Sequence, residues 1–163
     1  GIIPPNSGSV TIDNHNIYEN TESWHKLISY IPQKIFLFES SLENNIKLFD
    51  NTNSEKKFND IIEEVFRDVN SFDKLSSSTN NNPSKLSGGE TKKVGIARAL
   101  FKDHAILIID EGTAGLDKEY SEYIISKILN LKKTIIFISH DMNQLKKFDD
   151  IYKITGQKIQ KMF

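Results

Sequence analysis

The chain has 163 residues, of which 37% are hydrophobic and 26% are charged, and its formal net charge is −1. This length allows one sizeable hydrophobic core, so we expect a single domain. The absence of cysteine excludes disulfides, thiolate catalysis and cysteine-based zinc sites, and the near-neutral charge argues against a nucleic-acid partner. No apolar run exceeds five residues, whereas a membrane-spanning helix needs roughly 20, so we expect any membrane role to act through a partner.

The first part of the chain predicts a strand and a short helix. Two adjacent prolines and the NSGS turn favour a strand over residues 9–12. Residues 21–29 are predicted to form a helix whose Trp24, Leu27 and Ile28 face the core.

Residues 35–50 combine aromatic side chains with a predicted helix that is capped at Ser40 or Ser41. Three phenylalanines flank this helix: Phe36, Phe38 and Phe49. The pattern by itself favours an interpretation as hydrophobic core.

Residues 54–70 are predicted to form one continuous helix, because apolar side chains recur there at helical spacing. These side chains are Phe58, Ile61, Ile62, Val65, Phe66 and Val69. The polar stretch SSSTNNN over residues 76–82 has no hydrophobic anchor, and we interpret it as a flexible linker that ends at Pro83.

The sequence LSGGE at residues 86–90 predicts the start of an amphipathic helix. Ser87 followed by Glu90 is a capping-box pattern, and apolar residues at helical spacing follow it. The two glycines leave the first backbone N–H groups uncovered, so a phosphate fits against the positive end of the helix. The lysine pair Lys92–Lys93 in this helix is predicted to be solvated.

Two apolar segments that end in polar residues predict neighbouring parallel strands. AILIIDE ends in Asp110 and Glu111, and TIIFISH ends in His140. The spacing of apolar residues between them predicts a helix over residues 118–131 and therefore a right-handed crossover. Since ligands bind at the carboxyl edge of open α/β sheets, we expect these three polar side chains to share one site.

The remaining segments predict surface elements. His104 lies in a turn and is predicted to be solvated. Residues 143–148 are predicted to form a short helix, and two final strands are predicted around a turn at Thr155 and Gly156.

Four motifs occur in the order LSGGE, IIDE, AGLD and the His140 strand, with Gln33 upstream in YIPQ. Together they resemble the nucleotide-binding domain of ABC transporters, and the stretch FLFESSLENNI is similar to the exporter branch of that family. The resemblance implies an α/β fold whose core is P-loop NTPase-like, with a mostly parallel sheet and an inserted all-helical subdomain. It assigns residues 1–39 and 99–163 to the core and residues 40–98 to the helical subdomain.

The resemblance also implies that ATP and Mg²⁺ bind at the predicted edge. Hydrolysis of a nucleoside triphosphate requires a cation and a group that orients water. Asp110 is expected to hold Mg²⁺, while Glu111, turned to the opposite side by strand alternation, is expected to orient the water. His140 is expected to sense the γ-phosphate, and Gln33 to contact both Mg²⁺ and the water.

In the family, the LSGG element contacts ATP held by the P-loop of a second nucleotide-binding domain. Ser87, Gly88 and Gly89 are therefore expected to bind ATP across a head-to-tail dimer, and Asp117 to lie at the dimer interface. The other expected partner is a membrane domain, fused or separate, at the cytoplasmic face of the membrane. The resemblance allows the three phenylalanines of residues 35–50 to form an exposed docking patch for that domain.

The phosphate-binding loop GxxxxGK[ST] does not occur in the 163 residues. We therefore expect the sequence to start after the P-loop, to be inactive alone and to leave apolar surface exposed. The function implied is ATP binding and hydrolysis coupled to export. The alternatives are a non-hydrolysing module that lends its LSGGE motif to an intact partner, and a fragment of a non-transport ABC ATPase.

Overall fold

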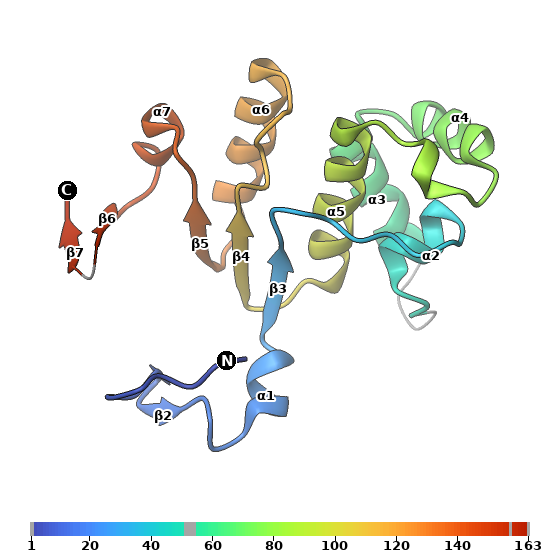
Figure 1. Cartoon of the computed structure of the whole chain (residues 1–163). Coiled ribbons are helices and arrows are strands. Elements are labelled where there is room, and N and C mark those ends of the chain that lie inside the picture. The colour runs from blue at the N-terminus through green and yellow to red at the C-terminus, as the bar shows by residue number, and fades with distance from the viewer. Residues whose placement is uncertain (1, 51–54, 157, 163) are drawn as a thin grey trace.

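A three-stranded parallel sheet forms the centre of the fold. The computed structural model describes residues 2–50, 55–156 and 158–162. The strands of this sheet are β3 (Ile28–Ile31), β4 (Ile106–Asp110) and β5 (Thr134–Ile138). They pair in the order β3-β4-β5, and the crossover helix α6 (Lys118–Leu129) joins β4 to β5 (Figure 1). The fold is therefore α/β, as predicted, and the carboxyl ends of the three strands lie at one edge.

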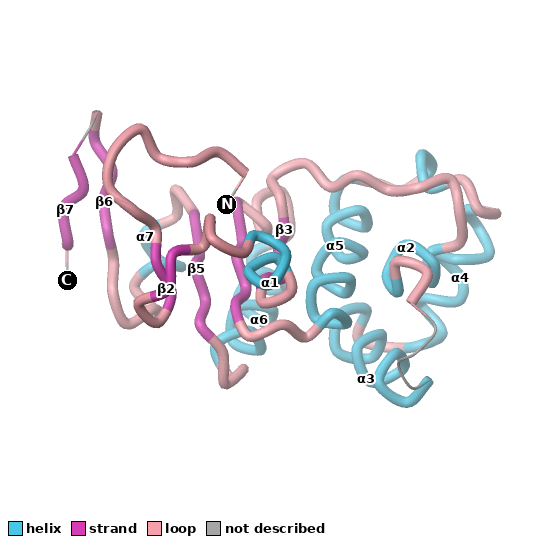
Figure 2. The backbone as a smooth tube through the Cα atoms, turned by 90° about the horizontal axis from the view of Figure 1, so that it is seen from below, coloured by secondary structure: helices cyan, strands magenta, loops and turns pink. Residues whose placement is uncertain are grey.

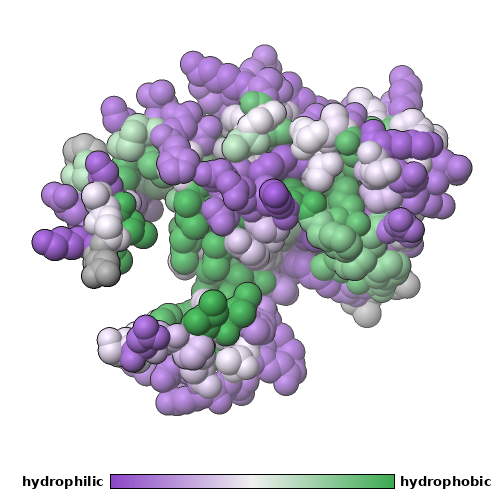
Figure 3. Space-filling view, in the orientation of Figure 1, coloured by the Kyte–Doolittle hydropathy of each residue, from purple (hydrophilic) through white to green (hydrophobic). Residues whose placement is uncertain are grey.

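The two faces of this sheet differ in burial. On one face Leu107 and Ile109 are buried, in a core that also contains residues of α6 and of helix α5 (Gly88–Lys102). On the other face Tyr30, Ile136 and Ile138 are 52%, 48% and 47% exposed. Figure 3 shows hydrophobic surface over the sheet and on the adjoining part of the N-terminal segment. Because parallel sheets are usually covered on both faces, this is the exposed apolar surface expected from the sequence.

A group of helices lies to one side of the sheet (Figure 2). Besides α5 they are α2 (Leu42–Lys47), α3 (Glu55–Phe66), α4 (Val69–Thr79) and the 3₁₀ helix η1 (Pro83–Lys85). Their core contains phenylalanines in edge-to-face contact, with ring centroids 5.0 Å apart for Phe66 and Phe72 and 5.8 Å apart for Phe58 and Phe72. The boundary expected between residues 98 and 99 falls inside α5, which contributes buried residues on both sides of it.

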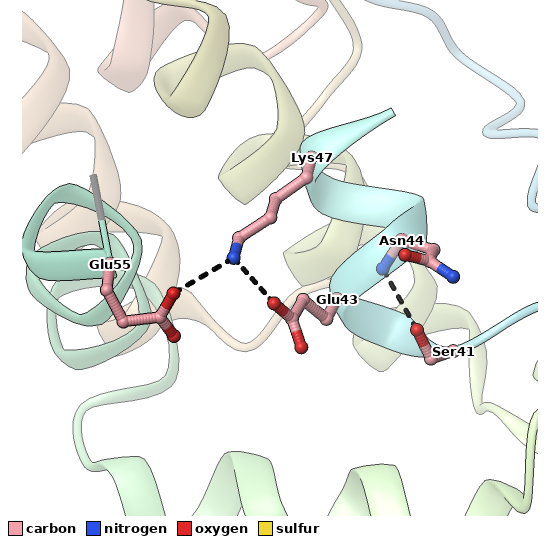
Figure 4. A network of polar contacts seen from close by, with 5 residues as sticks. All are labelled: Ser41, Glu43, Asn44, Lys47 and Glu55. Atoms are coloured by element: carbon pink, nitrogen blue, oxygen red, sulfur yellow. Dashed lines mark hydrogen bonds and ion pairs between the residues drawn. The ribbon is translucent and has the colours of Figure 1, made fainter. Parts of the chain in front are cut away.

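Lys47 links α2 to the start of α3. Its Nζ lies 2.5 Å from Glu43 Oε1 and 3.3 Å from Glu55 Oε2 (Figure 4). The hydrogen bond that Lys47 donates to the Glu43 carboxylate raises the pKa of Lys47, so this nearly buried ammonium stays charged. Ser41 caps the same helix, because its Oγ accepts the Asn44 N–H at 3.1 Å (Figure 4).

The single helix predicted over residues 54–70 is wrong, because the structure has two helices there. Arg67 separates them with a φ of 67°, a left-handed conformation that a right-handed helix does not continue through. Asp68 then caps α4 by accepting the Ser71 N–H at 3.0 Å. The hydrophobic repeat runs through the break, so periodicity alone did not reveal it.

The flexible linker predicted over residues 76–82 is also wrong, because α4 extends to Thr79. Hydroxyl groups in this polar stretch bond back to their own helix: Ser78 Oγ donates to Leu75 O and Thr79 Oγ1 to Ser76 O, both at 2.8 Å. The side chain of Thr79 is buried. The linker was predicted because this stretch lacks hydrophobic side chains. In the structure the hydroxyl groups of serine and threonine hold its first part in a helix instead.

The N-terminal segment forms a small separate sheet and a short helix beside β3 (Figure 1). Its elements are β1 (Thr11–Ile12), β2 (His15–Asn16) and α1 (Thr21–His25). The helix predicted over residues 21–29 was too long, and the expectation that it faces the core was wrong. No residue of α1 is buried, Leu27 is exposed, and Ile28 belongs to β3.

The C-terminal segment contains α7 (Met142–Leu145) and the antiparallel pair β6 (Tyr152–Thr155) and β7 (Lys158–Lys161). The pair forms a sheet of its own. The turn predicted at Thr155 and Gly156 is confirmed, and Gly156 has a φ of 59°, which favours glycine. In the described ranges, no helix combines the length and the hydrophobicity needed to cross a bilayer.

His104 is not the solvated residue that was predicted. It is half-buried, its Nδ1 lies 2.6 Å from the Ile28 carbonyl, and its own carbonyl accepts a hydrogen bond from Lys133 Nζ at 2.6 Å. These contacts join the turn before β4 to the neighbouring strand β3 and to the start of β5, so His104 stabilises the end of the sheet opposite the predicted site.

Candidate functional site

Glu111 lies at the carboxyl edge of the sheet and binds residues from the two neighbouring loops. Gln33 follows β3, and its Nε2 donates to Glu111 Oε2 at 2.8 Å. His140 follows β5, and its Nε2 lies 2.9 Å from Glu111 Oε1. The Glu111 side chain is 22% exposed and that of His140 is 95% exposed. Each carboxylate oxygen of Glu111 therefore has one partner among the described residues, and the imidazole faces solvent, where a ligand can reach it.

Asp110 occupies the last position of β4, on the exposed face of the sheet. Tyr30 in the adjacent strand donates its phenol hydroxyl to Asp110 Oδ2 at 3.4 Å. Burial of the phenol, with the charge and hydrogen bond of Asp110, raises the pKa of Tyr30. The hydroxyl therefore remains a hydrogen-bond donor to the carboxylate at neutral pH.

The backbone at Glu111 follows a left-handed turn. Its φ is 49°, and its N–H donates to the Ile138 carbonyl at 3.0 Å. Because β4 ends at Asp110, the expectation that strand alternation sets the direction of the Glu111 side chain was wrong. The left-handed turn and the bonds to Gln33 and His140 set that direction instead.

Two oxygen donors of the kind that a magnesium ion accepts are present at this edge. Asp110 offers a carboxylate, and Gln33 uses its amide nitrogen on Glu111 while its amide oxygen accepts no hydrogen bond from a described residue. Carboxylate and amide oxygens are ligands that Mg²⁺ accepts, with water completing its octahedral shell. The residues predicted to bind the metal thus have the chemistry that the ion requires.

The first turn of α5 presents the LSGGE motif with its predicted capping box. Ser87 Oγ accepts the Glu90 N–H at 3.3 Å, and Glu90 Oε2 accepts the Ser87 N–H at 2.7 Å. Ser87 and Gly88 are exposed, and a Cβ added to Gly88 would meet no atom within 4 Å. The backbone of this turn is therefore open to a ligand from outside the domain.

Asp117 is exposed and caps α6, because its Oδ1 accepts the Tyr120 N–H at 2.8 Å. No hydrogen bond or ion pair among the described residues brings Ser87, Gly88, Gly89 or Asp117 into contact with Glu111. The structure thus gathers Gln33, Asp110, Glu111 and His140 at one edge, and the other predicted residues form no direct hydrogen bond or ion pair with Glu111 among the described residues.

A cleft of ≈ 460 Å³ lies between the loops that follow β4 and β5. It is lined by Glu111 and His140 and by two residues that the sequence analysis did not single out, Thr113 and Gln144. Thr113 Oγ1 donates to Gln144 Oε1 at 3.0 Å, which ties the loop after β4 to α7. The motif pattern gave no signal for this bond, because neither Thr113 nor Gln144 belongs to one of the four motifs.

Lys92 is a further residue that sequence reasoning missed. It was predicted to be solvated, but it is half-buried, and its Nζ donates to the Glu111 carbonyl at 2.8 Å and to the Gln33 carbonyl at 3.1 Å. Burial lowers the pKa of Lys92, against the opposing effect of the Glu111 and Asp110 carboxylates. The prediction failed because a pair of lysines in a helix does not indicate that one of them binds main-chain carbonyls of the loops after β3 and β4.

The phenylalanines near α2 are exposed, so their interpretation as hydrophobic core was wrong. Phe36 is 71% and Phe49 is 57% exposed, and Phe38 packs edge-to-face against both, with centroids 5.4 and 6.1 Å apart. We call these three residues the aromatic patch. Arg98 holds its backbone, since its guanidinium donates to the Phe36 carbonyl at 3.0 Å.

The parallel sheet with polar groups at its carboxyl edge defines an α/β domain of the class that binds ligands at that edge. The chain belongs to the ABC transporter family, whose sequence profile matches residues 1–114.

Several proteins of known name or structure are similar to the chain. It is 32% identical over 144 residues to the lactococcin-A transport/processing ATP-binding protein LcnC of Lactococcus lactis, covering 85% of this chain and 20% of that protein. It is 31% identical over 171 residues to ABC transporter B family member 1 of Dictyostelium discoideum, covering 97% of this chain and 18% of that protein. A bacterial Atm1-family ABC exporter, solved with ATP bound, superposes with a TM-score of 0.74 at 25% identity, covering 91% of this chain and 27% of the exporter. The chain thus spans about a fifth of the length of the two curated relatives.

Proposed function

We propose that this domain binds and hydrolyses ATP as the ATP-binding part of an ABC exporter at the cytoplasmic face of a membrane. The observation that carries the proposal is Glu111, held at the carboxyl edge between the Gln33 amide and the His140 imidazole. A carboxylate with this support has a fixed direction and is accessible to water. These are the properties that a group needs in order to orient or deprotonate an attacking water.

The other residues of the edge take complementary roles in this proposal. Asp110 and the Gln33 amide oxygen would hold Mg²⁺, which would neutralise charge on the phosphates. Glu111 orients the water, and His140 donates a hydrogen bond to the γ-phosphate from its exposed position. The imidazole thereby links the presence of the γ-phosphate to the position of the Glu111 carboxylate.

The LSGGE turn serves a second ATP in the same proposal. Its backbone is exposed and open to a ligand from outside the domain, so we assign Ser87, Gly88 and Gly89 to ATP held by a second nucleotide-binding domain in a head-to-tail dimer. Asp117, exposed at the start of α6, lies at that dimer interface. The aromatic patch docks the membrane domain, because three clustered aromatic rings at the surface favour burial against a partner.

The 163 residues contain no GxxxxGK[ST] loop, so the test supplies one. In the chimera, residues 1–163 follow the P-loop segment of an active ABC ATP-binding domain. We expect ATPase activity in the chimera and a loss of about 100-fold or more in kcat with Glu111→Gln. The matched control is Glu122→Gln on the exposed face of α6, which should leave kcat unchanged. Equal activity of the two variants would overturn the role of Glu111.

The shared site is tested with a second pair of variants of the chimera. Ser87→Arg places a large cation on the open first turn of α5 and should abolish ATPase activity while ATP still binds to the P-loop. Ser77→Arg, at an exposed position of α4, is the matched control and should keep full activity. An active Ser87→Arg variant would contradict the assignment of LSGGE to ATP.

A further inference from the structure

Lys92 has an unusual set of partners for a lysine near two carboxylates. Its Nζ donates to the main-chain carbonyls of Gln33 and Glu111, at 3.1 and 2.8 Å, and forms no ion pair among the described residues. An ammonium at the surface usually stays hydrated or pairs with a carboxylate. Here the charge is half-buried and directed at two loops of the sheet edge, which indicates a specific contact rather than a solvated side chain.

The two carbonyls that Lys92 binds belong to the residues whose side chains meet at the candidate site. Gln33 and Glu111 follow different strands, and their side chains are joined by the 2.8 Å hydrogen bond from Nε2 to Oε2. One ammonium that binds both carbonyls fixes the distance between the backbones of the two loops. The position of the Glu111 carboxylate then depends on this backbone contact as well as on its hydrogen bond with the Gln33 side chain.

The backbone of Glu111 needs such support. Its left-handed φ of 49° is unfavourable for a residue with a Cβ. Two main-chain bonds hold it, from the Glu111 N–H to Ile138 O at 3.0 Å and from the Ala114 N–H to Glu111 O at 3.1 Å. Lys92 adds a charge-assisted bond to the same carbonyl, and such bonds are stronger than neutral ones.

Lys92 also connects two functional surfaces. It lies in α5, the helix whose first turn presents Ser87 and Gly88 to the outside. A shift of this helix, when a ligand binds at its first turn, is therefore passed to both loops by one side chain.

We propose that Lys92 is a positioning residue that holds the catalytic carboxylate of Glu111 and the Gln33 loop in register with the LSGGE helix. This inference rests on the proposed function, since it assigns Lys92 an effect on ATP hydrolysis. The neighbouring Lys93 provides a matched control. Its Nζ lies 4.5 Å from the centroid of the Tyr120 ring, so it contacts α6 instead of the sheet edge.

The first measurement is amide hydrogen exchange in the 163-residue chain, which needs no catalysis. Lys92→Met keeps the apolar stem and removes the cation. We expect about 10-fold faster exchange in residues 110–116, which include the Glu111 and Ala114 amides, and no change in α6. Lys93→Met should leave residues 110–116 as they are. Unchanged exchange in the Lys92→Met chain would overturn the proposal.

The second measurement is steady-state ATPase activity of the chimera. A carboxylate displaced by about 1 Å loses about 100-fold in kcat, so we expect that loss in Lys92→Met with KM changed less than about 3-fold. Lys92→Arg keeps a cation and should recover at least a tenth of the wild-type kcat. Equal loss in the Met and Arg variants overturns the positioning role. A chimera without activity before any substitution overturns the proposed function instead, and the exchange measurement then decides the role of Lys92.

Discussion

Asn45 in α2 holds the loop that carries part of the aromatic patch, and its replacement by alanine tests that packing. The side chain is fully buried. Its Oδ1 accepts the Phe38 N–H at 2.8 Å and a guanidinium N–H of Arg98 at 3.3 Å. Its Nδ2 donates to the carbonyls of Phe38 and Ser41, both at 3.0 Å. Alanine removes all of these hydrogen bonds, because its methyl group can neither donate nor accept one.

The expected loss follows from which groups are left without a partner. The Phe38 carbonyl keeps a bond from the Ser40 N–H at 2.8 Å, and the Ser41 carbonyl keeps one from the Asn45 N–H at 3.0 Å. The Phe38 N–H loses its acceptor, Asn45 Oδ1, and an N–H left without a partner costs about 1–3 kcal/mol. With about 1 kcal/mol for the further net loss of hydrogen bonding, Asn45→Ala should lower the free energy of unfolding by about 3 kcal/mol.

The assay is urea unfolding of the 163-residue chain, followed by circular dichroism at 222 nm. With an m-value of about 2 kcal/mol/M, the midpoint should fall by about 1.5 M. The control is Asn44→Ala in the same helix, whose side-chain amide donates to Ser40 Oγ at 2.8 Å; it should cost less than about 1 kcal/mol. Equal midpoints for the two variants would refute the reasoning about the orphaned N–H.

Three further substitutions test other contacts. His140→Ala should change the free energy of unfolding by less than about 0.5 kcal/mol, because the side chain is 95% exposed, yet lower the kcat of the chimera about 100-fold; melting curves and ATPase assays compare the two effects. Tyr120→Phe removes a hydrogen bond to a carbonyl at the end of α3 and should cost about 1 kcal/mol at pH 7. Burial raises the pKa of Tyr120 in the folded chain, so above about pH 10 the unfolded chain releases this proton first and the wild type loses its advantage. The free energies of unfolding of the wild type and of Tyr120→Phe, measured over an alkaline pH series, should therefore converge. Gly95→Ala places a Cβ 2.1 Å from Ile35 Cδ1 and 2.9 Å from Ile35 Cγ1 and should cost about 1 kcal/mol. Ile35→Val removes only the Cδ1 contact, so a double-mutant cycle should show partial recovery.

The carboxyl edge could be predicted from the sequence because two simple rules act together there. A short apolar run that ends in Asp110 and Glu111 indicates a buried strand, and a second run ends in His140. Parallel pairing then brings the two ends to one edge, whatever the details of packing. The 2.9 Å contact between Glu111 and His140 is a consequence of that register. Their chemical roles remain predictions.

The contacts of Lys92 and Asn45 could not be predicted in this way. Lys92 is separated from Gln33 by 59 positions in the sequence, and Arg98 is separated from Asn45 by 53. In both cases a side chain binds a main-chain carbonyl, Lys92 Nζ that of Gln33 and Arg98 Nε that of Asn45, so the residue type at the other end carries no information about the contact. The start of α4 was missed as well, because the hydrophobic repeat runs through the break and the cap that Asp68 forms with the Ser71 N–H was not inferred from the sequence.

Asp110 and Glu111 are neighbours, yet different interactions hold them in place. Asp110 belongs to β4, and its position is set by strand pairing with Ile138. Glu111 lies outside the strand and depends on the side chains of Gln33, Lys92 and His140, besides its main-chain bonds. A change in α5 or in the loop after β3 should therefore displace Glu111 while Asp110 stays in the sheet. In the proposed ATPase, the LSGGE helix then acts through Lys92 on Glu111 and on the Gln33 loop, while the Asp110 ligand of the metal keeps its place in the sheet.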